Sequence, residues 1–94
     1  MRKLDLTPAF DLNRELYATE PDEKNAVTRA LILFELLASS SNDTLPLPDD
    51  TIDFATGYTT VWAHALPDVK LVLTYIVTPE QIELWSLRRD LRPG

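Results

Sequence analysis

The 94-residue chain has no cysteine, one histidine and two glycines. Without cysteine there is no disulfide framework, no thiolate metal site and no cysteine nucleophile. One histidine is too few for a zinc site built on imidazoles, so we expect neither a metal nor a cofactor. Because Gly57 and Gly94 are the only glycines, the chain also lacks a glycine-rich phosphate loop and a nucleophile elbow.

Long apolar runs are also missing. The longest run, Ala30 to Phe34, has five residues, whereas a membrane span needs roughly 18 to 20. No transmembrane helix is therefore expected. Asp5, Pro8 and Asp11 interrupt the segment in which a signal peptide would need its apolar core. We therefore expect a cytoplasmic protein.

Basic residues are few. Nine Lys and Arg stand against fifteen Asp and Glu, which gives a net charge of −6. This charge repels nucleic acid and anionic membranes at long range, so a general polyanion-binding role is disfavoured. A chain of this length with 45% hydrophobic residues suits one core and one domain, residues 1–94.

The first half of the chain carries helical signals. Alternating polar and apolar residues at 2–6 predict a short opening strand. Thr7 and Pro8 supply a helix N-cap and a first helical residue, so a short helix begins there. Residues 19–22 are interpreted as the end of this helix and the capped start of another, and apolar residues then recur at spacings of three and four from Glu23 to Ala38. This spacing predicts a longer amphipathic helix.

The second half is expected to be extended. Prolines at 46 and 48 predict an irregular connection over residues 45–50, and Asp49, Asp50 and Asp53 are interpreted as a solvated acidic loop. Residues 58–66, 70–78 and 82–87 are predicted strands, of which 70–78 is apolar enough to lie in the middle of a sheet. The predicted order is βααβββ, an α+β fold.

This order resembles, over nearly the whole chain, the RelE/ParE superfamily of toxins from bacterial type II toxin-antitoxin pairs. Two stretches carry the resemblance. Residues 61–75, VWAHALPDVKLVLTY, are similar to the family's aromatic-led strand, tight turn, basic residue and apolar strand ending in tyrosine. Residues 83–90, ELWSLRRD, are similar to its final strand, which closes with arginines and an acidic residue; this chain has Leu87 where many members have a histidine.

The resemblance implies a RelE/ParE-like domain in which a helical hairpin packs on one face of a small, mostly antiparallel sheet and the other face carries a groove. It also implies a cognate antitoxin that wraps and neutralises the protein. Two activities are known in the family. RelE-like members cleave messenger RNA on the ribosome, whereas ParE-like members inhibit gyrase by binding it.

The candidate catalytic cations follow from the resemblance. Metal-free RNA cleavage requires side chains that remove a proton, stabilise the phosphorane and protonate the leaving oxygen. Lys70 matches the family's basic residue before the third strand, and Arg88 and Arg89 match its final arginines, so these three would hold the phosphate. The alternative is that Lys70 is a solvated charge at a strand end and the two arginines belong to a soluble tail.

His64 is the candidate that would move the proton, because imidazole is the side chain that ordinarily titrates near neutrality. Alternation along the strand places His64 on one face with Trp62 and Leu66, opposite Ala63 and Ala65. We expect this row to face the core, which opposes a catalytic role.

The net charge separates the two activities. A ribosome-dependent nuclease must approach a dense polyanion, and a net charge of −6 opposes that approach. We therefore predict a toxin-like component that is neutralised by an antitoxin and binds a cellular target such as gyrase. The alternatives are a ribosome-dependent mRNA endoribonuclease and a non-toxic domain that self-associates, as a homodimer, through an exposed strand edge.

Overall fold

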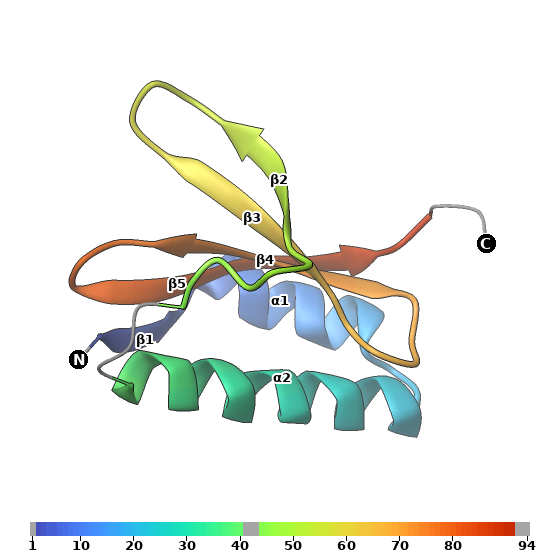
Figure 1. Ribbon diagram of the computed structural model, residues 1–94. Coiled ribbons are helices and arrows are strands. Elements are labelled where there is room, and N and C mark those ends of the chain that lie inside the picture. The colour runs from blue at the N-terminus through green and yellow to red at the C-terminus, as the bar shows by residue number, and fades with distance from the viewer. Residues whose placement is uncertain (1, 41–43, 92–94) are drawn as a thin grey trace.

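The computed structural model describes residues 2–40 and 44–91, which form a sheet with two helices on one face (Figure 1). The elements in chain order are β1 (Lys3–Leu6), α1 (Pro8–Tyr17), α2 (Pro21–Ser39), β2 (Thr51–Ala55), β3 (Thr60–Ala65), β4 (Leu71–Val77) and β5 (Gln81–Arg89). The α+β class and both predicted helices are confirmed. None of the helices in these two ranges is long and apolar enough to cross a bilayer.

Both helices begin with a local cap followed by proline. The Thr7 hydroxyl accepts a hydrogen bond from the Phe10 N–H at 3.1 Å, and Pro8 is the first residue of α1. Glu20 caps α2 through a capping box, in which its own N–H donates to the Glu23 carboxylate at 3.1 Å. These bonds satisfy N–H groups that a helix start otherwise leaves without partners.

The sheet has the strand order β1-β5-β4-β3-β2. β1 runs parallel to β5, and the other three neighbouring pairs are antiparallel. β4 is the middle strand, and its residues 71–75 are all buried. The prediction of a central strand covered on both faces is therefore confirmed, as is the mostly antiparallel sheet.

The core lies between the helices and one face of this sheet. α2 contributes Ala30 and Phe34, while β4 contributes Leu73 and Tyr75, and all four side chains are at most 5% exposed. Phe34 and Tyr75 pack with their ring centroids 4.8 Å apart. The small residues along α2 let the helix backbone approach the sheet, so the large rings of the two layers interdigitate.

The predicted order is corrected by one additional strand. Residues 51–55 form β2, which pairs antiparallel with β3, so the order is βααββββ. Asp53 therefore lies on a strand and not in a loop. All five residues of β2 are exposed, so the strand has no buried alternation that would mark it in the sequence. Pairing with β3 decides its conformation.

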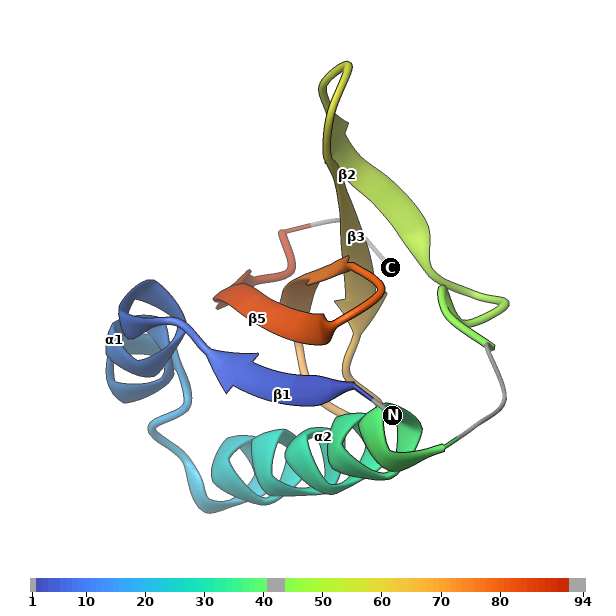
Figure 2. The same ribbon diagram turned by 90° about the vertical axis from the view of Figure 1, so that its left-hand side faces the viewer.

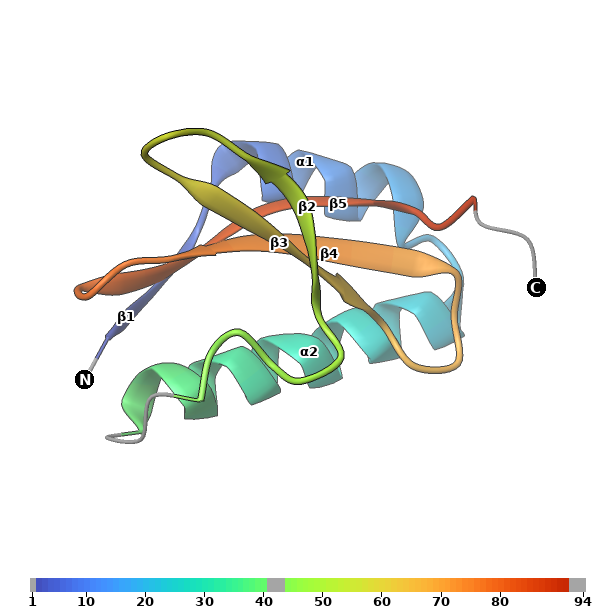
Figure 3. The same cartoon turned by 45° about the horizontal axis from the view of Figure 1, so that its top comes forward.

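The β2–β3 hairpin extends away from the helices (Figures 1 and 2). Seen from another direction, it crosses over β4 and β5 at an angle (Figure 3). Register shifts between Ile52 and Phe54 and between Thr74 and Tyr75 mark bulges, which increase the local twist of a sheet. The curl places β2 above the sheet face that the helices leave open.

Candidate functional site

A groove of about 630 Å³ lies on this open face of the sheet. Its base includes Ala63 and Ala65 of β3 and Val72 of β4, and its sides include Asp53 of β2 and Arg88 of β5. The two alanines leave the hollow because a methyl group fills little of the space above a sheet. Their position opposite His64 confirms the predicted alternation along β3.

An ion pair spans the groove. Arg88 Nη2 lies 2.5 Å from Asp53 Oδ1, and the two side chains are 45% and 23% exposed. A pair this accessible contributes only about 0 to 1 kcal/mol to stability. Its larger effect is on recognition, because the Asp53 carboxylate neutralises the Arg88 guanidinium, which the RelE/ParE resemblance predicted to hold a phosphate.

An aromatic pair on the same face joins the hairpin to β5. Phe54 of β2 and Trp85 of β5 stack with their ring centroids 6.4 Å apart and their planes at 11°. Both remain exposed, at 49% and 41%, and Ile52 and Tyr58 of the hairpin are exposed at 58% and 100%. Exposed aromatic and aliphatic side chains grouped in this way are typical of protein-binding surfaces.

The structure does not bring the four predicted catalytic residues together. Arg88 and Arg89 are successive residues of β5, so their side chains start from opposite faces of the sheet. Both residues line the groove, but their guanidinium groups have different partners: Arg88 pairs with Asp53, whereas Arg89 Nη1 lies 3.5 Å from Glu23 Oε2 of α2. Both arginines belong to a strand, so the alternative interpretation as a soluble tail is corrected.

Lys70 and His64 are also separated. Lys70 is exposed just before β4, as expected for a strand-end charge. His64 lies on the helix face of the sheet, where its ring packs edge-on against Phe34 with centroids 5.5 Å apart and planes at 87°. Trp62 and Leu66 pack in or against the same core, so the predicted core-facing row is confirmed.

His64 belongs to a hydrogen-bonded cluster around a buried carboxylate. Its Nδ1 lies 2.8 Å from Asp50 Oδ1, and the Asp50 side chain is only 2% exposed. The Tyr75 hydroxyl donates to Asp50 Oδ2, and the Leu47 N–H donates to the Tyr75 oxygen at 3.4 Å. The interpretation of Asp50 as a solvated loop charge is therefore wrong. It fastens the connection before β2 to the sheet.

The Tyr75 hydroxyl keeps its proton in this cluster. Burial and the hydrogen bond to Asp50 raise the pKa of Tyr75 well above its usual range, so the phenol stays protonated and donates. With Nδ1 directed at Asp50, the imidazole is oriented in the way that a carboxylate orients a general base. His64 packs against Phe34 on the helix face of the sheet, whereas the groove and Arg88 lie on the other face, so the structure does not place them in one site.

Neither a metal-binding cluster nor a similar protein assigns a function to the groove or to the buried cluster. Within residues 2–40 and 44–91, no group of three or more His, Asp or Glu side chains is placed to hold a metal ion. No protein-family model, no curated protein and no solved structure matches the chain. The interpretation of the groove and of the buried cluster therefore depends on their own geometry.

Proposed function

We propose that this chain is a toxin-like component of the RelE/ParE type that acts by binding a protein target through the open face of its sheet. The observation that carries the proposal is the exposed Phe54–Trp85 stack on the face that holds the groove. Aromatic side chains supply large contact areas with few rotatable bonds, and they are frequent hot spots of protein interfaces. A cognate antitoxin is the expected neutralising partner, and gyrase is the first target to test.

The placement of the charged residues favours binding over RNA cleavage. Cleavage requires cations that converge on one phosphate, together with an acid and a base. Here Arg88 is paired with Asp53 and Arg89 with Glu23. His64 is bound to Asp50 on the other face of the sheet. This arrangement supports binding more than it supports the alternative of a ribosome-dependent endoribonuclease.

The β2 edge gives the antitoxin an extended surface. β2 ends the strand order of the sheet, and its five residues are exposed. An extended peptide can add to such an edge through backbone hydrogen bonds, with side-chain pockets setting specificity. The same edge favours a second candidate function, the non-toxic homodimer, because two copies of an open strand edge can pair with each other.

Controlled expression in bacteria tests the proposal. We expect growth arrest without codon-linked cuts in translated messages, and inhibition of gyrase supercoiling by the purified protein. Phe54→Ser and Trp85→Ser should relieve the arrest, whereas Leu12→Ser, which alters an exposed apolar side chain of α1, should not.

The other outcomes discriminate between the candidates. Cuts at codon boundaries would establish the nuclease and overturn the binding proposal. Normal growth with folded protein present, together with a dimer in sedimentation equilibrium, would favour the self-associating domain. Arrest that both Ser substitutions and the Leu12 control relieve equally would show that the aromatic stack is not the binding surface.

A further inference from the structure

A second pocket, of about 460 Å³, lies between α1 and α2, on the helix side of the sheet and away from the groove. Its volume falls within the roughly 300 to 1,000 Å³ of small-molecule sites. It exists because small residues connect the helices. α1 ends at Tyr17, and Ala18 and Thr19 follow before α2 begins. The Ala18 N–H donates to the Arg14 carbonyl oxygen at 3.1 Å.

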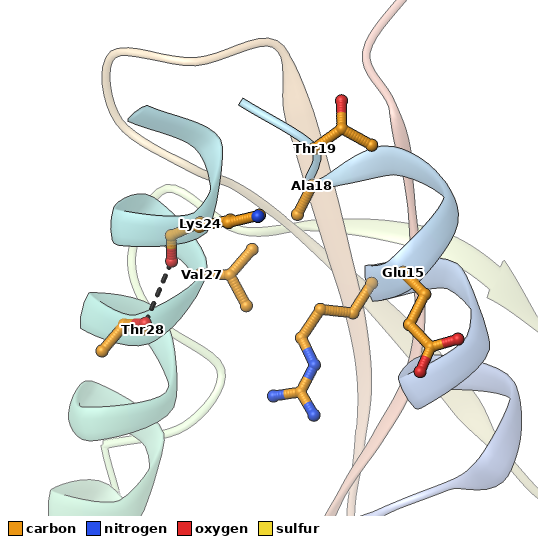
Figure 4. A pocket seen from close by; sticks show the side chains of 7 residues that line it. Glu15, Ala18, Thr19, Lys24, Val27 and Thr28 are labelled. Carbon is orange, nitrogen blue, oxygen red and sulfur yellow. Dashed lines mark hydrogen bonds between the residues drawn. The ribbon is translucent and has the colours of Figure 1, made fainter. Parts of the chain in front are cut away.

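The base of this pocket is apolar. Ala18 and Val27 line it and are only 4% and 2% exposed. Figure 4 shows Val27 and Lys24 reaching from α2 toward Ala18 and Thr19 at the end of α1. The Thr28 hydroxyl is already used, because it donates to the Lys24 carbonyl oxygen at 3.0 Å. An apolar group of a ligand is therefore the natural contact for this part of the pocket.

Two cations border the same hollow, Arg14 from α1 and Lys24 from α2. Arg14 is held in place by Asp11, with Nη2 2.9 Å from Oδ1, and its guanidinium lies 5.9 Å from the centre of the Phe10 ring. Within residues 2–40 and 44–91, no carboxylate forms an ion pair with the Lys24 ammonium.

The acidic residues nearby neutralise one of these two cations. Asp11 pairs with Arg14 and Glu23 pairs with Arg89, so Lys24 is the pocket cation that supplies an unneutralised charge among the described residues. Glu15 also lines the pocket, but its side chain extends over α1, away from Lys24 (Figure 4). Lys24 therefore supplies the positive charge over the apolar base, and the Arg14 guanidinium, which has five N–H donors and is joined to Asp11 through Nη2, can also donate hydrogen bonds to an anion.

We propose that this pocket binds a small organic carboxylate that carries an apolar ring or short chain. The apolar part lies against Ala18 and Val27, and the carboxylate lies between Arg14 and Lys24. Charge-assisted hydrogen bonds to guanidinium and ammonium groups orient such an anion. The ligand is of benzoate size or somewhat larger, since a cavity of about 150 Å³ already holds benzene.

Benzoate is the probe for the test, followed by backbone amide shifts of the full chain in NMR titrations. We expect saturable shifts at Thr19, Val27 and Thr28 with a dissociation constant on the order of 1 mM, as few ligand atoms allow. Benzamide has the same shape without the charge, and it should bind at least roughly tenfold more weakly.

Three variants separate a built site from a general charge effect. Lys24→Gln should weaken benzoate binding by roughly tenfold. Arg29→Gln, an exposed cation of the same helix that does not line this pocket, should leave it unchanged. Thr28→Phe places a ring into the pocket from its exposed rim and should remove the saturable shifts, while an unchanged circular dichroism spectrum reports a retained fold.

Four results would overturn the proposal. They are an absence of saturable shifts with benzoate, equal affinity for benzamide, equal loss with Lys24→Gln and Arg29→Gln, and full binding by a folded Thr28→Phe protein. None of these results bears on the groove, which lies on the other side of the sheet. Benzoate binding and growth arrest therefore succeed or fail separately.

Discussion

Replacing Asp50 by alanine should destabilise the fold far more than its loop-like sequence context suggests. The carboxylate accepts from the Tyr75 hydroxyl and binds His64 Nδ1, and the Tyr75 side chain is fully buried. Hydrogen bonds to charged groups contribute about 1.5 to 3 kcal/mol each. Removing the carboxylate also removes the cost of burying it, so we expect a net loss of about 3 kcal/mol. This loss is large, because the whole free energy of unfolding of a small domain is about 5 to 15 kcal/mol.

Urea unfolding followed by circular dichroism measures this loss. Asp49→Ala is the matched control, because Asp49 is the preceding residue and is exposed, and it should change the free energy of unfolding by less than about 0.5 kcal/mol. Asp50→Asn keeps one acceptor oxygen and should fall between the two. If Asp49→Ala and Asp50→Ala unfold at the same urea midpoint with the same slope, the reasoning about the buried cluster is refuted.

Three further changes test the core, the cluster and the groove. Because burial and Asp50 raise the pKa of Tyr75, unfolding should be coupled to proton release above about pH 10, where the unfolded phenol ionises. The contribution of Tyr75 to the free energy of unfolding is fully present below that pH and falls by up to about 1.4 kcal/mol per pH unit above it. Urea melts in this range should show that slope in the parent and not in Tyr75→Phe, and equal slopes would contradict the assignment. Leu73→Ala, at a fully buried position of β4, should cost about 2 to 5 kcal/mol, and a thermal melt that drops no further than that of exposed Leu12→Ala would count against the core assignment. Arg88→Ala should cost less than about 1 kcal/mol, and this cost should shrink at high salt; a larger, salt-independent loss would show that its pair with Asp53 is not a surface ion pair.

The helices were predictable because their signals are local. Thr7 and Pro8 mark the start of α1 within two residues, and the capping box of α2 spans Glu20 to Glu23. Apolar residues at helical spacing then identify the side of α2 that packs on the sheet. The apolar run around Leu73 likewise identified the central strand.

The opposite directions of the two arginine side chains could also have been predicted from the sequence. Arg88 and Arg89 are adjacent in a strand, so alternation alone separates their side chains onto opposite faces. Extending the predicted last strand by two residues would have indicated that the two side chains start in opposite directions, although both residues line the groove. The exposure of Trp85 could not be read in this way, because a bulge near Thr74 and Tyr75 changes the register of the strands that meet there.

The sequence by itself determined the α+β class, the two helices and their caps, the central strand and the alternation that turns His64 toward the core. Only the tertiary structure decided that residues 51–55 are a strand and that Asp50 is buried. The partners of Asp50 lie 14 and 25 residues further along the chain. A carboxylate becomes a buried acceptor or a solvated charge according to which groups the fold brings to it, and short-range patterns carry no record of contacts at that separation.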